Sequence, residues 1–127
     1  MKRKKIIYVA GNPLVKEDSI PLRIMAKLQE DFKHFEFREL EPTDNPPEEK
    51  TLHIIDTVIG IDNVRVIKDI DSLVTGKVYS LHDFDLGFNL KLMKKMGKLK
   101  GVRIIGVPAH MKEHLALKGV RKALRNM

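Results

Sequence analysis

The sequence predicts a three-layer α/β/α sandwich with a mainly parallel central sheet. Short apolar runs alternate along the chain with segments of helical period, which is the pattern of an α/β fold. Residues 5–10 and 102–107 are almost continuously apolar, which is typical of strands buried on both faces of a parallel sheet. At 127 residues the chain is long enough for one hydrophobic core, so we expect a single domain over residues 1–127.

A strand over residues 5–10 and a helix that reaches residue 31 are expected first. A Gly-Asn-Pro turn ends the strand, and apolar residues then recur at the helical positions 20, 24 and 28. Asp18 or Ser19 can cap this helix, and Pro21 suits its first turn because a proline there loses no intrahelical hydrogen bond.

Two further strands are expected before residue 60. Residues 35–40 alternate apolar and polar side chains, which indicates a strand at the edge of the sheet with one face in water. The acidic, proline-rich residues 41–50 indicate a loop. Residues 52–58 form a mostly apolar strand that is expected to end near Asp56.

The second half of the chain continues the alternation of strand and helix. Pro108 ends the last strand because it cannot donate a hydrogen bond to the sheet. The expected elements are extended segments over residues 64–67 and 78–81, helices over residues 86–96 and 115–124, and a strand over residues 102–107.

Composition narrows the possible functions. The chain has no cysteine, which excludes disulfides, thiolate zinc sites and a cysteine nucleophile. It has no apolar run long enough to span a membrane, and the apolar stretch after its basic N-terminus is too short for a signal peptide, so we expect a cytoplasmic protein. The absence of Cys and Trp, with 32% charged residues, is compatible with a thermophilic source.

Positive charge is concentrated in the C-terminal third. Residues 91–127 hold 11 Lys or Arg residues and one acid, Glu113. Such a surface suits nucleic acid or an acidic protein. The lysines at positions 91, 94, 95 and 98 have the spacing of a solvated helix face, and no aromatic interleaving or nucleic-acid-binding motif occurs, so nucleic acid is the least favoured partner.

Three turns near the ends of predicted strands carry side chains that can bind metal. Asp18 follows the first strand, Asp56 lies at the end of the third, and His82 follows the extended segment near residue 80. The carboxyl ends of parallel strands gather at one edge of a sheet, where ligands bind. Two carboxylates and an imidazole delivered to that edge can form a metal site with open coordination positions.

The two acids also have structural interpretations, which stay open at this point. Asp18 can be a helix N-cap, and the adjacent Glu17 could take any role that is assigned to Asp18. Asp56 can cap a turn or pair with a lysine, because a carboxylate in an apolar strand costs free energy unless it is paired or bound to metal.

His82 can be a solvated loop residue or a ligand that Asp83 or Asp85 orients through a hydrogen bond. The other histidines are weaker candidates. His110 and His114 lie four apart, but no Glu follows His110 as the metalloprotease motif requires, so we expect both to be surface residues.

The motifs, in this order, resemble those of the nickel–iron hydrogenase maturation endopeptidases. That family opens with a strand, a Gly-Asn turn, an acid pair and a helix with an early arginine, to which Gly11-Asn12, Glu17-Asp18 and Arg23 are similar. Residues 54–57 (Ile-Ile-Asp-Thr) look like its second motif, and residues 80–83 (Ser-Leu-His-Asp) look like its third. The resemblance covers the whole chain.

The resemblance implies an α/β/α fold, a site and a reaction. By position, Asp18, Asp56 and His82 would contact metal, and Asp83 could assist proton transfer. The metal would be nickel already installed in a hydrogenase large-subunit precursor, so it belongs to the substrate. The enzyme would then remove a short C-terminal extension from that precursor, with the metal polarising the scissile carbonyl or a bound water.

Two other functions remain as alternatives. The first is a non-catalytic metal- or protein-binding α/β module that docks a partner through the basic C-terminal third. The second is nucleic-acid binding, which a steep fall in binding affinity with rising salt concentration would favour. Cleavage of a precursor separates the peptidase from the binding module.

Overall fold

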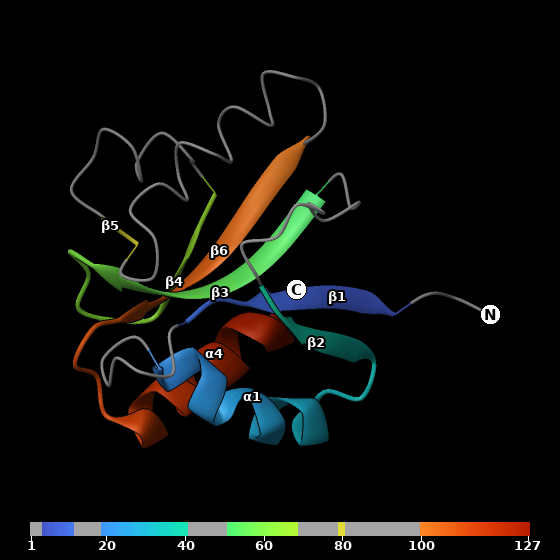
Figure 1. The fold of residues 1–127 in the computed structure, drawn as a ribbon, viewed down its shortest axis with the longest axis horizontal. Coiled ribbons are helices and arrows are strands. Elements are labelled where there is room, and N and C mark those ends of the chain that lie inside the picture. Colours follow the sequence, from blue (N-terminus) through green and yellow to red (C-terminus); the bar gives the residue numbers. More distant parts are fainter. Residues whose placement is uncertain (1–3, 12–18, 41–50, 69–78, 81–99) are drawn as a thin grey trace.

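The computed structural model describes residues 4–11, 19–40, 51–68, 79–80 and 100–127. Within these segments all six strands join one sheet of order β2-β1-β3-β6-β4, and β5 pairs with β3 beside this path (Figure 1). The elements are β1 (Lys5–Val9), α1 (Ile20–Asp31), β2 (Phe35–Glu39), β3 (Thr51–Ile59), β4 (Arg65–Ile67), β5 (Tyr79–Ser80), β6 (Gly101–Pro108) and α4 (Glu113–Arg125).

The sheet is mainly parallel, which confirms the predicted α/β class. Strands β2, β1, β3 and β6 are mutually parallel neighbours, whereas β4 runs antiparallel to β6 and β5 antiparallel to β3. Strand β2 lies at the edge, as its alternating side chains predict. The predicted loop over residues 41–50 and the predicted helix over residues 86–96 lie outside the described residues.

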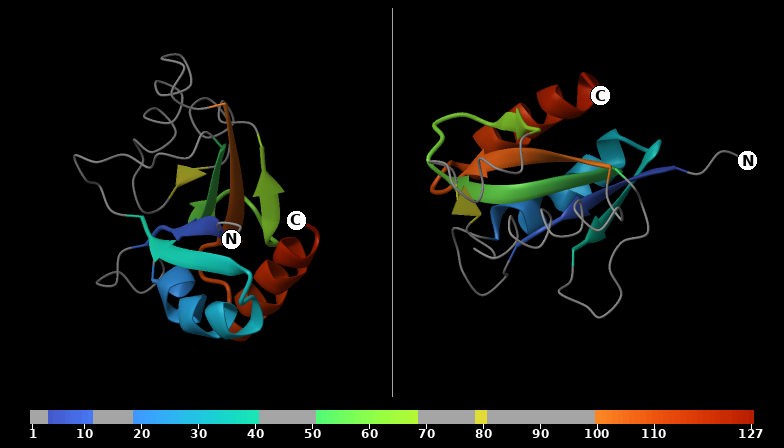
Figure 2. Two further views of the ribbon diagram at one scale, coloured as in Figure 1. Left: turned by 90° about the vertical axis from the view of Figure 1, so that its right-hand side faces the viewer. Right: turned by 90° about the horizontal axis from the view of Figure 1, so that it is seen from above.

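Both described helices cover the same face of the sheet (Figures 1 and 2). Helix α1 contributes Ile24 and Leu28 to the core on this face, and α4 contributes Leu117 and Val120. The strand side chains that meet them are Ile7, Val9, Phe35, Phe37, Ile55, Ile105 and Val107. Neither helix is long and apolar enough to cross a membrane, and the same holds for the rest of the described chain.

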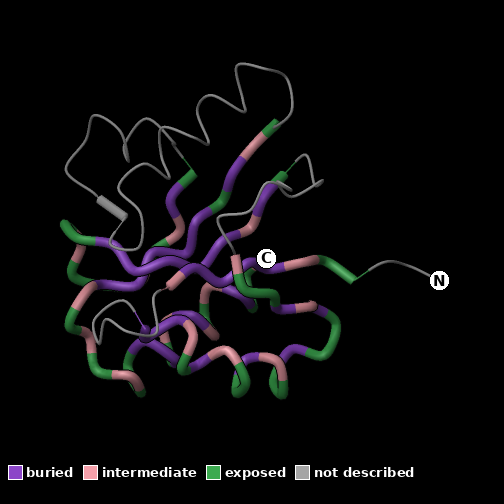
Figure 3. The backbone as a smooth tube through the Cα atoms, in the orientation of Figure 1, coloured by how far each residue is buried: buried purple, intermediate pink, exposed green. Residues whose placement is uncertain are grey.

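The opposite face of the sheet carries a second buried cluster. It is built from alternate residues of the same strands, such as Tyr8, Ile54, Val58 and Ile104. The central strands are buried along much of their length (Figure 3). Burial on both faces is typical of the central strands of a parallel sheet. A helical layer on this face, which the three-layer prediction requires, is not among the described elements.

Two ion pairs join α1 to α4 at the rim of their apolar contact. Arg121 Nε lies 2.6 Å from Asp31 Oδ2, and Arg23 Nη1 lies 3.7 Å from Glu113 Oε1. All four side chains are partly exposed, so each pair contributes about 0–1 kcal/mol. The apolar residues beneath these pairs hold the two helices on the sheet.

The side chain of Gln29 pairs with the outer edge of β2. Gln29 Nε2 donates to the carbonyl oxygen of Phe35 at 2.8 Å, and Phe37 N donates to Gln29 Oε1 at 3.0 Å. Leu40 N donates to Val9 O in β1. Because backbone groups alternate in direction along a strand, the backbone N–H and C=O groups of Phe35 and Phe37 point away from β1. The Gln29 carboxamide therefore bonds to the backbone groups of β2 with which a further strand would pair.

Candidate functional site

The order of the strands places a switch in direction between β1 and β3. After β1 the chain continues to β2, which lies beside β1 on the side away from β3. After β3 the next parallel strand is β6, which lies beside β3 on the side away from β1. In open α/β sheets, ligands bind outside the carboxyl ends of strands at such a point. The sequence-based expectation of a site at this edge therefore falls between β1 and β3.

Asp56 lies at this switch point. The pairing of β1 with β3 ends at Val9 and Ile55, and Ala10 N donates to Ile55 O at 2.8 Å. Asp56 is thus the first residue of β3 beyond the reach of β1. Its side chain is fully buried, and on its other side it is in register with Gly106 of β6.

Strand β3 runs from Thr51 to Ile59, within one residue of the expected bounds 52–58, but it ends three residues beyond Asp56 rather than near it. The strand continues to Ile59 because β6 pairs with it through Val58 and β5 pairs with Val58 and Ile59. The residues that extend the strand are apolar or β-branched, so nothing in the sequence itself marks a stop. Asp56 consequently lies within a strand, and its backbone is held by β6.

Gly106, which is in register with Asp56, leaves room for apolar side chains over β6. By alternation Asp56 shares the face of Ile54 and Val58, opposite the helices. A Cβ on Gly106 would lie 3.0 Å from Val58 Cγ2, 3.1 Å from Ile67 Cδ1 and 3.2 Å from Ile61 Cδ1. A side chain at position 106 would therefore displace these three side chains.

Thr57 adds a second buried oxygen on the other face. Its side chain is fully buried, and its Oγ1 has no hydrogen-bond partner in the described structure. An unsatisfied buried hydroxyl costs about 1–3 kcal/mol, and such groups are rare in proteins. The sequence gives Thr57 no role of its own, because threonine in an apolar run indicates only a strand. Its position directly after Asp56 was the available signal.

The remaining predicted site residues, Asp18, His82 and Asp83, lie outside the described residues, as does Glu17. Their distances from Asp56 are therefore not part of the structure. Within the described segments, no group of three or more His, Asp or Glu side chains lies close enough together to hold a metal ion.

Ser19, at the start of α1, does not act as a side-chain cap. Its backbone is helical, and no side-chain cap hydrogen bond forms, so that part of the capping prediction is wrong. The hydroxyl instead accepts a hydrogen bond from Arg23 Nε at 3.0 Å, and Arg23 also faces Glu113 of α4. Pro21 lies in the first turn of the helix, as predicted.

The four described histidines lie in different environments. His110 and His114 are exposed, as expected for surface residues. The ring of His34 is tilted by 42° against that of Phe35, with ring centroids 4.1 Å apart. His53, within β3, is half-buried, and burial lowers its pKa from the ordinary value of 6.5, helped by the charges of Lys5 and Arg103.

This shift makes folding stability depend on pH. Because the pKa of His53 is lower in the folded chain, the unfolded chain binds a proton more readily below about pH 6.5. The contribution of His53 to the free energy of unfolding is therefore present above that pH and is lost as the pH falls through the folded pKa. We expect His53→Gln to reduce the loss of stability between pH 7.5 and 5.5 in urea titrations. The exposed His114→Gln is the control, and an identical pH dependence in wild type and His53→Gln would contradict the assignment.

Comparison of the chain with protein-family models, with curated proteins and with solved structures finds no match.

Proposed function

We propose that the chain is a cytoplasmic endopeptidase of the hydrogenase-maturation type. It would remove a C-terminal extension from a nickel-loaded hydrogenase large-subunit precursor. The observation that supports this most is the fully buried carboxylate of Asp56 at the switch point between β1 and β3. The resemblance of three ordered motifs, at residues 11–23, 54–57 and 80–83, supports the choice of reaction.

Asp56 is suited to engage a metal carried by the substrate. In the interior, where the dielectric is lower than in water, a carboxylate attracts a cation more strongly than it does at the surface. The backbone of Asp56 is fixed by its pairing with β6, which limits the motion of the ligand. Carboxylate oxygens and imidazole nitrogens suit nickel, and in this proposal Asp18 and His82 supply the other two ligands.

The reaction is hydrolysis of one peptide bond. Water adds to the scissile carbonyl carbon, the C–N bond breaks, and the proton released by the water passes to the leaving amine. Asp83 would carry that proton as general base and then general acid. The substrate-borne nickel polarises the carbonyl or the attacking water.

The test is a cleavage assay on hydrogenase large-subunit precursors prepared with and without nickel. We expect intact-mass spectrometry to show loss of the C-terminal extension only from the nickel-loaded form. Cleavage of both forms at the same rate would show that the site does not engage the nickel of the substrate. Absence of cleavage of any nickel-loaded precursor would overturn the peptidase proposal.

A second candidate function is a non-catalytic protein-binding module that uses the basic C-terminal third. The observation that favours it is an open pocket on α4, which is lined by three cations and by none of the candidate peptidase residues.

A further inference from the structure

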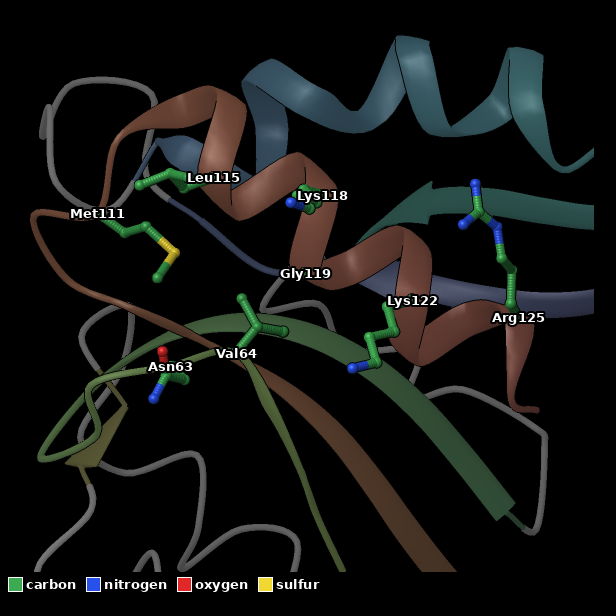
Figure 4. Close-up of a pocket in the computed structure, with 8 residues that line it drawn as sticks. All are labelled: Asn63, Val64, Met111, Leu115, Lys118, Gly119, Lys122 and Arg125. Atoms are coloured by element: carbon green, nitrogen blue, oxygen red, sulfur yellow. The ribbon is translucent and has the colours of Figure 1, made fainter.

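An open pocket of about 400 Å³ lies between helix α4 and the segment that precedes β4 (Figure 4). Val64 points from that segment toward the helix at Gly119. A Cβ on Gly119 would lie only 2.7 Å from Val64 Cβ, so the glycine is what lets the two elements approach this closely. The pocket is thus built by a specific contact between α4 and residues that lie 55 positions earlier in the chain.

One end of the pocket is apolar. It is lined by Val64, Met111 and Leu115, of which Val64 and Met111 are partly exposed. Leu115 is 45% exposed, and among the described residues only one other large apolar side chain, Ile59, is as exposed. An exposed leucine beside two further apolar side chains can receive an apolar side chain from a partner.

The other end of the pocket is cationic. Lys118, Lys122 and Arg125 line it, all three are exposed, and none forms an ion pair with a described residue. None of the described residues that line the pocket carries a carboxylate. The two ion pairs of α4, through Glu113 and Arg121, are made on the side that meets α1.

The helix dipole explains only part of this charge. Cations in the last turn of a helix are stabilising, which accounts for Lys122 and Arg125. Lys118 lies in the middle of α4, where that effect has faded. The chain as a whole carries a formal charge of +7, so the pocket adds to a long-range field that attracts anions.

We propose that this pocket docks an acidic peptide segment of a partner protein, with one apolar side chain as its anchor. The anchor would lie against Val64, Met111 and Leu115, and carboxylates would pair with the cations along α4. From Leu115 to Arg125 the helix rises about 15 Å, which about four to five extended residues span. The fitting segment therefore has an apolar residue at one end and several acids along the rest of its length.

Other occupants fit less well. A second copy of this chain would bring the same net positive charge and the same cations toward the pocket. A nucleic acid would meet the cations but would gain nothing from the apolar end, because no aromatic side chain lines the pocket for base stacking. The docking proposal does not depend on the peptidase proposal, since it uses no residue of that site.

The test uses a fluorescein-labelled peptide with one leucine followed by four glutamates, and measures binding by fluorescence anisotropy. We expect Lys118→Glu/Lys122→Glu to weaken binding by at least about tenfold. The control is Lys27→Glu/Lys33→Glu, which makes the same change in net charge at an exposed position in α1 and one just after it. It should alter affinity by less than about threefold.

Leu115→Ala separates docking from general charge attraction. Because Leu115 is exposed, this variant should keep its fold and still bind the peptide about tenfold more weakly. The proposal is overturned if Leu115→Ala binds as the wild type does, or if both double variants lose affinity equally. A single-stranded oligonucleotide that binds more tightly than the peptide, and does so independently of Leu115, would assign the surface to nucleic acid instead.

Discussion

Replacing Asp56 with asparagine is expected to abolish precursor cleavage while leaving the fold intact. The amide keeps the size of the side chain but removes the negative charge that would engage the substrate-borne metal, and removal of one such electrostatic group typically costs at least about 100-fold in rate. The amide has nearly the same size as the carboxylate and can still form hydrogen bonds, so the free energy of unfolding should fall by no more than about 1–3 kcal/mol, which leaves the protein folded. Initial rates on a nickel-loaded precursor and urea titrations measure the two effects.

The matched control is Asp62→Asn. Asp62 is exposed in the segment between β3 and β4, so the same chemical change there should leave both cleavage and stability as in the wild type. If Asp56→Asn retained full cleavage activity, the assignment of Asp56 would be wrong. If it instead unfolded the protein, Asp56 would be a structural residue.

A large loss of stability is expected from Leu117→Ala in α4. Leu117 is 7% exposed and packs in the core between the helices and the sheet. Its truncation should lower the free energy of unfolding by about 2–5 kcal/mol, because it removes buried methyl groups and leaves a cavity. That is a large share of the total of about 5–15 kcal/mol that domains of this size have.

Leu115→Ala provides the comparison on the same helix. Both substitutions change helix propensity by the same amount, so the difference between them reports burial. Leu115 is 45% exposed, and its truncation should change stability by no more than about 0.5 kcal/mol. Urea unfolding curves with equal m-values would measure the free energy of unfolding of both variants. Equal losses of stability in the two variants would contradict the burial of Leu117 and the exposure of Leu115.

The elements of the fold could be predicted where the local pattern was strong. The helix of residues 20–31 and the strands β1, β2 and β6 lie within one or two residues of their expected bounds because periodicity and proline mark them. The bounds of β3 are likewise within one residue of those expected, but its continuation past Asp56 was missed, since it depends on pairing with β5 and β6 from distant parts of the chain. The antiparallel direction of β4 was missed for the same reason, because register and direction are long-range properties.

The candidate site could be predicted only in part. A carboxylate near the end of an apolar strand identified Asp56, and strand order then put it at the switch point. The role of Gly106 could not be predicted, because it depends on which residue of β6 lies in register with Asp56. The meeting of Asp18, Asp56 and His82 remains a prediction, since two of the three lie outside the described residues.

The Gln29 carboxamide has a consequence for how the protein behaves at high concentration. An edge strand exposes backbone groups that can recruit a strand from a neighbouring molecule, and such recruitment leads to aggregates. Here the first two groups that an incoming strand would need on β2 are already bonded to a side chain of α1. Growth of the sheet at this edge would require the Gln29 bonds to break first, so the helix that builds the core also limits self-association of the sheet.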